Sequence, residues 1–185
     1  MIPSPDTCLR LMDTYEMPSH IRRHSIMVER IACLLAERLR KVGLSLSLEK
    51  VKAGALMHDI AKSLCLKTGE GHAVKGREIC LQNNLDEIAE IVAEHVVLKN
   101  HRPDAPITEK EIVYYADKRV NHDVVVSLEE RLQYLLERYG KEMAHLEQAI
   151  MRNFEICKEV ERLIFSKLNL DPGDLAEMLH SEGGS

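Results

Sequence analysis

Apolar residues recur every three or four positions along almost the whole chain, as the buried face of an amphipathic helix requires. Glycines and prolines interrupt this pattern at several places and indicate where helices end. The pattern predicts helices over residues 6–15, 19–42, 47–62, 72–83, 86–99 and 141–168, one after Thr108 that carries Asp117, one from Ser127 to near Gly140, and a short one opened by Asp171 and Pro172.

Capping residues strengthen several of these predictions. Ser47 precedes one helix, and Thr108 with Glu111 forms the spacing of a capping box. Residues 64–71, which contain two glycines, are expected to form a loop, and residues 181–185 a frayed tail. No stretch alternates apolar and polar residues with period two, so no strand is expected. The chain is therefore predicted to be all-α, as a single-domain helical bundle.

The composition agrees with a helical core. The chain has 185 residues, which suits one domain, and contains two Phe, five Tyr and no Trp. Aliphatic side chains must then fill the interior, which favours helix-on-helix packing. The formal net charge of −5 argues against nucleic acid as a partner, because phosphate backbones are bound through Lys and Arg.

The cysteines and the N-terminus bear on location. Five widely spaced cysteines without a Cys-x-x-Cys pair are typical of reduced thiols, and thus of a cytoplasmic protein. The first residues lack the basic and apolar segments of an export signal. No apolar run approaches the roughly 20 residues that span a bilayer, so no membrane association is expected.

The adjacent pair His58 and Asp59 is the strongest indication of chemistry. It lies in an apolar stretch predicted to be helical and buried. A buried carboxylate and imidazole need a partner, and a divalent cation can use both as ligands. Neighbouring helical residues point about 100° apart, so we expect Asp59 to bridge two cations while His58 reaches one of them.

Further candidate metal ligands occur along the chain, one in each of four other predicted helices. They are His24, His72, His95 and Asp117. The segments 56–62 (LMHDIAK), 72–76 (HAVKG) and 114–118 (YYADK) carry the His58–Asp59 pair, His72 and Asp117, respectively. Over residues 19–121, these segments and their order resemble the HD-domain superfamily of metal-dependent phosphohydrolases.

The resemblance implies a domain organisation and a ligand set. Residues 1–125 would form the metal-binding helical core, residues 126–169 C-terminal helices packed on it, and residues 170–185 a short helix and tail. The first metal would be held by His24, His58, Asp59 and Asp117, and the second by His72, His95 and the bridging Asp59. Such mixed ligands suit two divalent ions of Fe, Mn, Zn, Co or Ni, and the spacing does not choose among them.

The implied reaction is attack on phosphorus by a metal-activated water. Asp59 and Lys62 are the catalytic candidates. Lys62 is also the first candidate for a phosphate contact, and Lys118 and Arg23 are further ones. The six-ligand layout and the segment 60–62 (IAK) resemble small bacterial enzymes that hydrolyse dinucleoside polyphosphates, which implies a nucleotide or dinucleoside polyphosphate as substrate. The absence of a Gly-Tyr-Pro word disfavours the cyclic-dinucleotide phosphodiesterases.

Two other functions remain open from the sequence. One is a di-iron oxygenase of the HD type, and the other is a regulatory module that binds a nucleotide without turnover. The apolar stripe of residues 141–168 is interpreted as core packing or as the surface of a homodimer.

Overall fold

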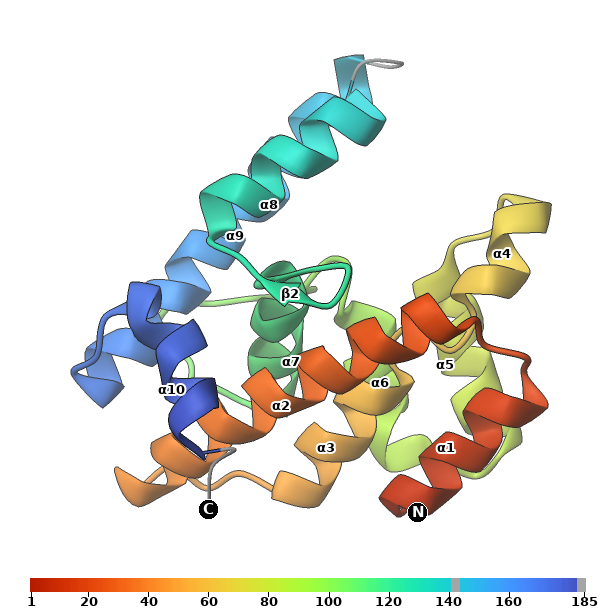
Figure 1. Cartoon of the computed structure of the whole chain (residues 1–185), viewed down its shortest axis with the longest axis horizontal. Helices are drawn as coiled ribbons and strands as arrows, with labels where there is room; N and C mark the ends of the chain where they lie inside the picture. The colour runs from red at the N-terminus through yellow and green to blue at the C-terminus, as the bar shows by residue number, and fades with distance from the viewer. Residues whose placement is uncertain (141–143, 183–185) are drawn as a thin grey trace.

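Helices make up most of the computed structural model, which describes residues 1–140 and 144–182 (Figure 1). The all-α prediction is confirmed. The elements in chain order are α1 (Pro5–Thr14), α2 (Ser19–Lys41), α3 (Leu48–Met57), α4 (Lys62–Thr68), α5 (His72–Gln82), α6 (Asp86–Glu94), α7 (Glu109–Lys118), β1 (Val120–Asn121), β2 (Val124–Val125), α8 (Leu128–Leu135), the π-helix η1 (Leu136–Gly140), α9 (Ala144–Leu168), the 3₁₀-helix η2 (Pro172–Asp174) and α10 (Leu175–Glu182).

The predicted caps set several helix ends. The side chain of Ser47 accepts a hydrogen bond from the amide of Lys50 at 3.2 Å, at the start of α3. The capping box of Thr108 and Glu111 is complete at the start of α7. Side-chain caps of this kind satisfy amide groups that the first helical turn leaves unpaired.

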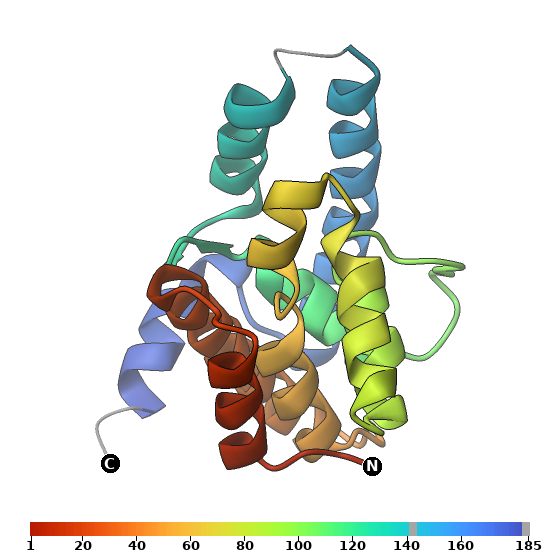
Figure 2. The ribbon, with the colours of Figure 1, turned by 90° about the vertical axis from the view of Figure 1, so that its right-hand side faces the viewer.

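The long helix α2 lies at the centre of the bundle. It packs against α3 and α7, and α6 packs against both of these helices. Helix α5 pairs with α6, and α1 covers α3 (Figures 1 and 2). The interior is filled mainly by aliphatic side chains, as the composition predicts, including Ile31, Leu35, Leu39, Val51, Ile88 and Ile112.

Two glycines allow the helices around α6 to approach closely. A Cβ atom at Gly54 of α3 would lie 2.6 Å from Cγ2 of Ile91. A Cβ atom at Gly76 of α5 would lie 2.7 Å from Cγ1 of Val92. Real Cβ atoms do not approach other carbons this closely, so the packing of α3 and α5 on α6 depends on glycine at both positions.

Helices α8 and α9 form a hairpin that extends beyond the rest of the bundle (Figures 1 and 2). The C-terminal half of α9 packs on α7 and α2 and buries Phe154, Cys157, Val160 and Ile164. Residues 141–143, where the sequence predicted the start of this helix, lie outside the described residues, as do residues 183–185 of the predicted tail. Ser181 still belongs to α10.

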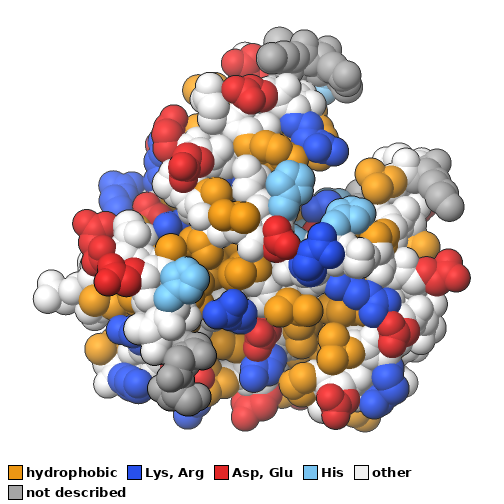
Figure 3. Space-filling model, viewed as in Figure 1, with side chains coloured by type: hydrophobic (Ala, Val, Ile, Leu, Met, Phe, Trp, Pro, Cys, Tyr) orange, Lys and Arg blue, Asp and Glu red, His pale blue; other side chains and the backbone are white. Residues whose placement is uncertain are grey.

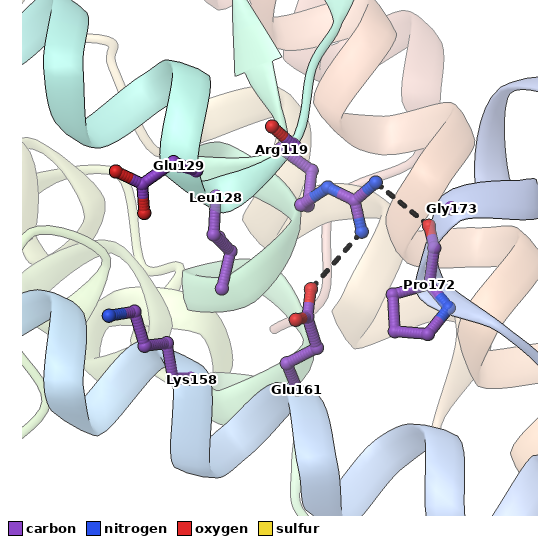
Figure 4. Close-up of a pocket in the computed structure, with 8 residues that line it drawn as sticks. Arg119, Leu128, Glu129, Lys158, Glu161, Pro172 and Gly173 are labelled. Atoms are coloured by element: carbon purple, nitrogen blue, oxygen red, sulfur yellow. Dashed lines mark hydrogen bonds and ion pairs between the residues drawn. The ribbon is translucent and has the colours of Figure 1, made fainter.

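Arg119, which directly follows α7, joins the C-terminal elements to the bundle. Its guanidinium donates to the carbonyls of Val126 at 2.6 Å and Pro172 at 2.9 Å. It also donates to Glu161 at 3.2 Å and to the hydroxyl of Tyr115. Figure 4 shows Arg119 between α9 and the segment that carries Pro172. Because Arg119 is almost fully buried, these acceptors compensate the desolvation of its charge.

Three local predictions away from His58 and Asp59 were wrong. Residues 64–68, expected in a loop, belong to α4, because Gly69 adopts a φ of +73° and caps that helix instead of marking a loop. Helix α6 ends at Glu94 rather than near Lys99. Residues 120–125 form a short antiparallel pair, with Val120 opposite Val125, where no strand was expected.

Two further observations concern the whole described chain. Its five cysteines are all free thiols. None of the described helices combines the length and the apolar character that crossing a membrane requires.

Candidate metal centre

His58 and Asp59 lie in a turn, not within a helix as the sequence predicted. Helix α3 ends at Met57, and α4 starts at Lys62. The turn is closed by hydrogen bonds from Ile60 to the carbonyl of Met57 and from Lys62 to the carbonyl of Asp59, both 3.0 Å. This change of direction lets both neighbouring side chains point inward, with exposed fractions of 0% for His58 and 1% for Asp59.

The carboxylate of Asp59 faces two groups of histidines with its two oxygen atoms. Its Oδ2 lies 3.5 Å from Nε2 of His58 and 3.9 Å from Nε2 of His24. Its Oδ1 lies 3.3 Å from Nε2 of His72 and 3.5 Å from Nε2 of His95. Within each group the ligand atoms lie no more than 4.8 Å apart. This arrangement is the one that a carboxylate bridging two cations needs.

Asp117 completes the first group. Its Oδ1 lies 3.0 Å from Nε2 of His24 and 3.6 Å from Nε2 of His58. Its other oxygen, Oδ2, accepts a hydrogen bond from Lys118 at 3.0 Å. The structure thus brings together all six predicted ligand residues, from α2, the turn after α3, α5, the residue that follows α6, and α7.

Three of the four histidines are held from behind by main-chain carbonyls. In each of them Nδ1 contacts a carbonyl oxygen, which can only accept, so Nδ1 donates its proton there and Nε2 is the nitrogen turned toward the centre. Outer contacts of this kind are typical of histidines that bind metals. The pairs are His24 with His122 at 2.8 Å, His58 with Ala55 at 2.7 Å and His95 with Val92 at 2.6 Å.

Two buried polar atoms at the centre have no hydrogen-bond partner. They are Nε2 of His58 and Oδ1 of Asp59. Buried polar atoms in folded proteins are nearly always paired, because leaving one unpaired costs about 1–3 kcal/mol. One atom belongs to each group of ligands, and a cation bound to each group would satisfy both. The residues present therefore fit divalent metal ions.

Burial and close charges shift the pKa values of these groups. Burial disfavours the charged form of His58, but Asp59 and Asp117 outweigh it and raise the pKa of His58 to about 9. Burial lowers the pKa of His95 to about 4. The pKa values of both carboxyls are held well below the ordinary value in spite of burial, mainly by His58 and Lys62 for Asp59 and by Lys118 for Asp117. Both aspartates are therefore ready to bind a cation at neutral pH.

Lys62 lies at the mouth of the centre. Its Nζ is 2.7 Å from Oδ2 of Asp59, and its side chain is 36% exposed. Burial opposes its charge, but the carboxylates of Asp59 and Asp117 outweigh this effect and raise its pKa. A permanently charged ammonium at this place can contact an anion that enters from solvent.

The two weaker candidates for substrate contact are less available to a ligand than Lys62, although Lys118 also lines the cavity next to the metal centre. Lys118 is buried and donates to Asp117 and to the main-chain carbonyl of His95, so its ammonium is already engaged. Arg23 pairs with Asp123 at 3.0 Å and does not line the cavity next to the metal centre.

That cavity has a volume of about 530 Å³, within the usual range for small-molecule sites. One wall consists of the metal-centre residues and Lys62, and the opposite wall includes Arg131, Tyr134 and Arg138 of the α8–α9 hairpin. Figure 3 shows histidine and basic side chains gathered where the surface is hollowed beside the hairpin. Sequence reasoning missed this second wall, although the spacing of Arg131, Tyr134 and Arg138 places them on one helix face.

Comparisons with known proteins agree with this geometry. The profile of the HD domain family matches residues 21–122, more than half of the chain, and this segment contains all six predicted ligand residues. An uncharacterized protein of Methanocaldococcus jannaschii, MJ0778, is 28% identical over 150 residues, which cover 74% of this chain and 88% of that protein. Ribonuclease Y of Thermosipho melanesiensis is 33% identical over 97 residues, 52% of this chain but 17% of that enzyme. No solved structure matches the chain significantly.

Proposed function

The chain belongs to the HD domain family, whose members are in general metal-dependent phosphohydrolases, and we propose that it hydrolyses a phosphoester or phosphoanhydride bond of a nucleotide. The main observation behind this proposal is the position of the Asp59 carboxylate. Its two oxygen atoms face two different groups of histidines. The unpartnered buried atoms of His58 and Asp59 support it further.

Two groups of residues would hold the metal ions. His24, His58, Asp59 and Asp117 would hold one ion, and His72, His95 and Asp59 the other. Imidazole and carboxylate ligands suit Fe, Mn, Zn, Co or Ni. When bound, such ions lower the pKa of water toward neutrality and neutralise charge on phosphoryl oxygens.

The protein's own side chains would orient the substrate and keep the ligands in place. Lys62 would bind a phosphoryl oxygen, because its ammonium is partly exposed and lies beside Asp59. Lys118 would hold Asp117 in position from the buried side. Fixed charges of this kind stabilise the transition state because they need no reorganisation during the reaction.

A nucleotide is favoured over a long nucleic acid as the substrate. The name of the Thermosipho relative points to RNA, but this chain spans 17% of that enzyme. The net charge of −5 disfavours an extended phosphate backbone. The cavity of about 530 Å³ matches a ligand of nucleotide size.

The proposal is tested by elemental analysis of the purified protein, followed by a hydrolysis screen. The panel contains mononucleotides, dinucleoside polyphosphates and a short oligoribonucleotide, each with Mn, Fe, Co, Ni or Zn. We expect release of phosphate or mononucleotide from at least one nucleotide. Silence across the panel with metal-loaded protein would overturn the proposal. Oxygen uptake that occurs with iron alone would point instead to the oxygenase, and tight binding of an unchanged nucleotide to the regulatory module.

A further inference from the structure

The wall of the cavity opposite the metal centre comes from a part of the chain that the HD family profile does not match. Helix α8 and the π-helix η1 contribute Arg131, Tyr134, Leu135, Arg138 and Tyr139 to the lining. Helix α9 adds Leu146, Ile150, Asn153 and Phe154. The family profile ends at residue 122, so this wall is a feature of the chain beyond the shared metal-binding core.

The hairpin wall combines planar cationic and aromatic groups. The guanidinium of Arg138 donates to the hydroxyls of Tyr134 at 3.0 Å and Tyr139 at 3.1 Å. It also lies over both rings, 6.0 Å and 5.5 Å from their centroids. The guanidinium of Arg131 lies 5.6 Å from the centroid of Tyr134. Aromatic rings and guanidinium planes of this kind are the surfaces on which nucleobases stack.

Arg131 has bonding capacity left for a ligand. One of its terminal nitrogens donates to Asn121 at 2.6 Å, whereas its Nε is buried without a hydrogen-bond partner. A buried donor of a charged group normally has an acceptor. Because Arg131 lines the cavity, its guanidinium presents a fixed positive charge to a phosphate group bound there.

The charge distribution along the cavity also favours an anion. Of the described residues that line it, Asp59 and Asp117 carry the carboxylates, and both face the histidines of the metal centre. The hairpin wall contributes the cations Arg131 and Arg138. An anion would therefore meet positive charge on the hairpin side and at Lys62.

The irregular helix η1 contributes to this wall. Arg138 and Tyr139 both line the cavity from within the π-helix. Single π-turns of this kind occur frequently at functional sites.

We propose that the α8–α9 hairpin is the element that selects a nucleotide. The base stacks on Tyr134 and the Arg138 guanidinium, and Arg131 binds a phosphate oxygen while the scissile phosphoryl group reaches Lys62. This inference deepens the proposed function and rests on it for the identity of the reacting bond. It adds that a small phosphate ester without a base lacks the stacking contacts with Tyr134 and Arg138.

The test is calorimetric binding to the metal-loaded full chain. The probes are adenosine 5′-(β,γ-imido)triphosphate and inorganic phosphate, and the variants are Tyr134→Leu and Arg138→Gln. We expect the wild type to prefer the nucleotide, and each variant to weaken nucleotide binding about tenfold, the range for loss of one stacking contact. Phosphate binding by Tyr134→Leu should change less than twofold, since phosphate does not use the stacking surface of that ring.

Matched variants control for general damage. Arg152→Gln changes an exposed arginine on α9 that does not line the cavity, and should bind as the wild type does. Tyr134→Phe restores the ring and should recover most of the binding lost in Tyr134→Leu. Circular dichroism checks that each variant is folded.

The outcomes separate this inference from the proposed function. Equal nucleotide binding by the wild type and both hairpin variants, or a wild type that binds the nucleotide no better than phosphate, would overturn the inference. If both hairpin variants hydrolyse a nucleotide as fast as the wild type does, the inference is overturned while the proposed function stands. Hairpin-dependent binding without hydrolysis of any panel member would overturn the proposed function and leave the inference in place.

Discussion

The buried ammonium of Lys118 donates a hydrogen bond to the main-chain carbonyl of His95, and thereby ties α7 to the end of α6 beneath the metal centre. The same ammonium lies 3.0 Å from Oδ2 of Asp117. Lys118 also lies over the ring of Tyr114, 4.2 Å from its centroid. One side chain therefore positions two of the six candidate ligand residues.

Replacing Lys118 by Met should weaken metal binding. Asp117 would lose its partner on Oδ2, and the end of α6 would lose its tie to α7. Loss of such an outer contact typically lowers metal affinity by about 10–100-fold. Competition with a chromophoric chelator measures the change. Lys158→Met, at a partly exposed lysine paired with Glu155, is the control, and equal affinity in both variants would show that Lys118 does not position Asp117.

Asp59→Asn should remove metal and activity together. The amide nitrogen cannot act as a ligand, so at least one of the two histidine groups loses its bridging oxygen. Elemental analysis and the nucleotide assay should both show the loss, with activity down by roughly a hundredfold or more. Asp123→Asn, at a partly exposed aspartate paired with Arg23, should retain both. Full metal content in Asp59→Asn would disprove the bridging role.

Lys62→Gln should lower kcat and leave the metal content intact. Its ammonium contacts Asp59 from the mouth of the cavity and is not itself a ligand. Loss of one fixed charge at a reacting phosphoryl group is expected to reduce kcat by about 10²–10³. Lys52→Gln, at a partly exposed lysine 3.6 Å from Glu29, serves as the control. If Lys62→Gln loses its metal, Lys62 supports Asp59 instead of the substrate.

The stability of chelator-treated protein should fall as the pH rises from about 6.5 to about 9. The folded chain raises the pKa of His58 from 6.5 to about 9, so it binds more protons than the unfolded chain in this interval. The corresponding stabilisation is complete below pH 6.5 and is lost as the pH passes 9. The slope should reach at most about 1.4 kcal/mol per pH unit in urea unfolding. His58→Asn should flatten it, and an unchanged slope in that variant would refute the assignment.

Gly76→Ala should destabilise the protein although alanine favours helices. The added methyl group would lie 2.7 Å from Cγ1 of Val92 and would push α5, which carries His72, away from α6. Overpacking of this kind costs about 1–3 kcal/mol, more than the gain of about 1 kcal/mol in helix propensity. Urea unfolding measures the difference. The double variant with Val92→Ala should recover part of the loss, and a Gly76→Ala protein as stable as the wild type would contradict this reading.

The metal centre could be predicted from the sequence because its residues contrast with their surroundings. His58 and Asp59 are polar residues in an apolar stretch, and such residues need a partner whatever the details of the fold. The turn after Met57 could not be predicted from the sequence, because the apolar pattern of the helix continues through the residues that form the turn. That turn is what allows both neighbouring side chains to face the same centre.

The hairpin wall was not predicted for a different reason. Arg131, Tyr134 and Arg138 lie on a helix face of mixed polarity, and such a face in a sequence indicates contact with water. Whether it faces solvent or a cavity depends on where α8 folds back relative to α2 and α4, which local patterns do not determine. Gly69 shows the same limit on a smaller scale, since a glycine can end a helix or mark a loop.

The hydrogen bonds of Arg119 restrict how the protein can be shortened. A fragment that stopped at residue 125 would contain the six candidate ligands but would lack the acceptors at Val126, Glu161 and Pro172. The guanidinium would then have lost most of its acceptors one residue beyond Lys118, at the end of the helix that supplies Asp117. Minimal versions for engineering therefore need to retain the chain at least through Pro172.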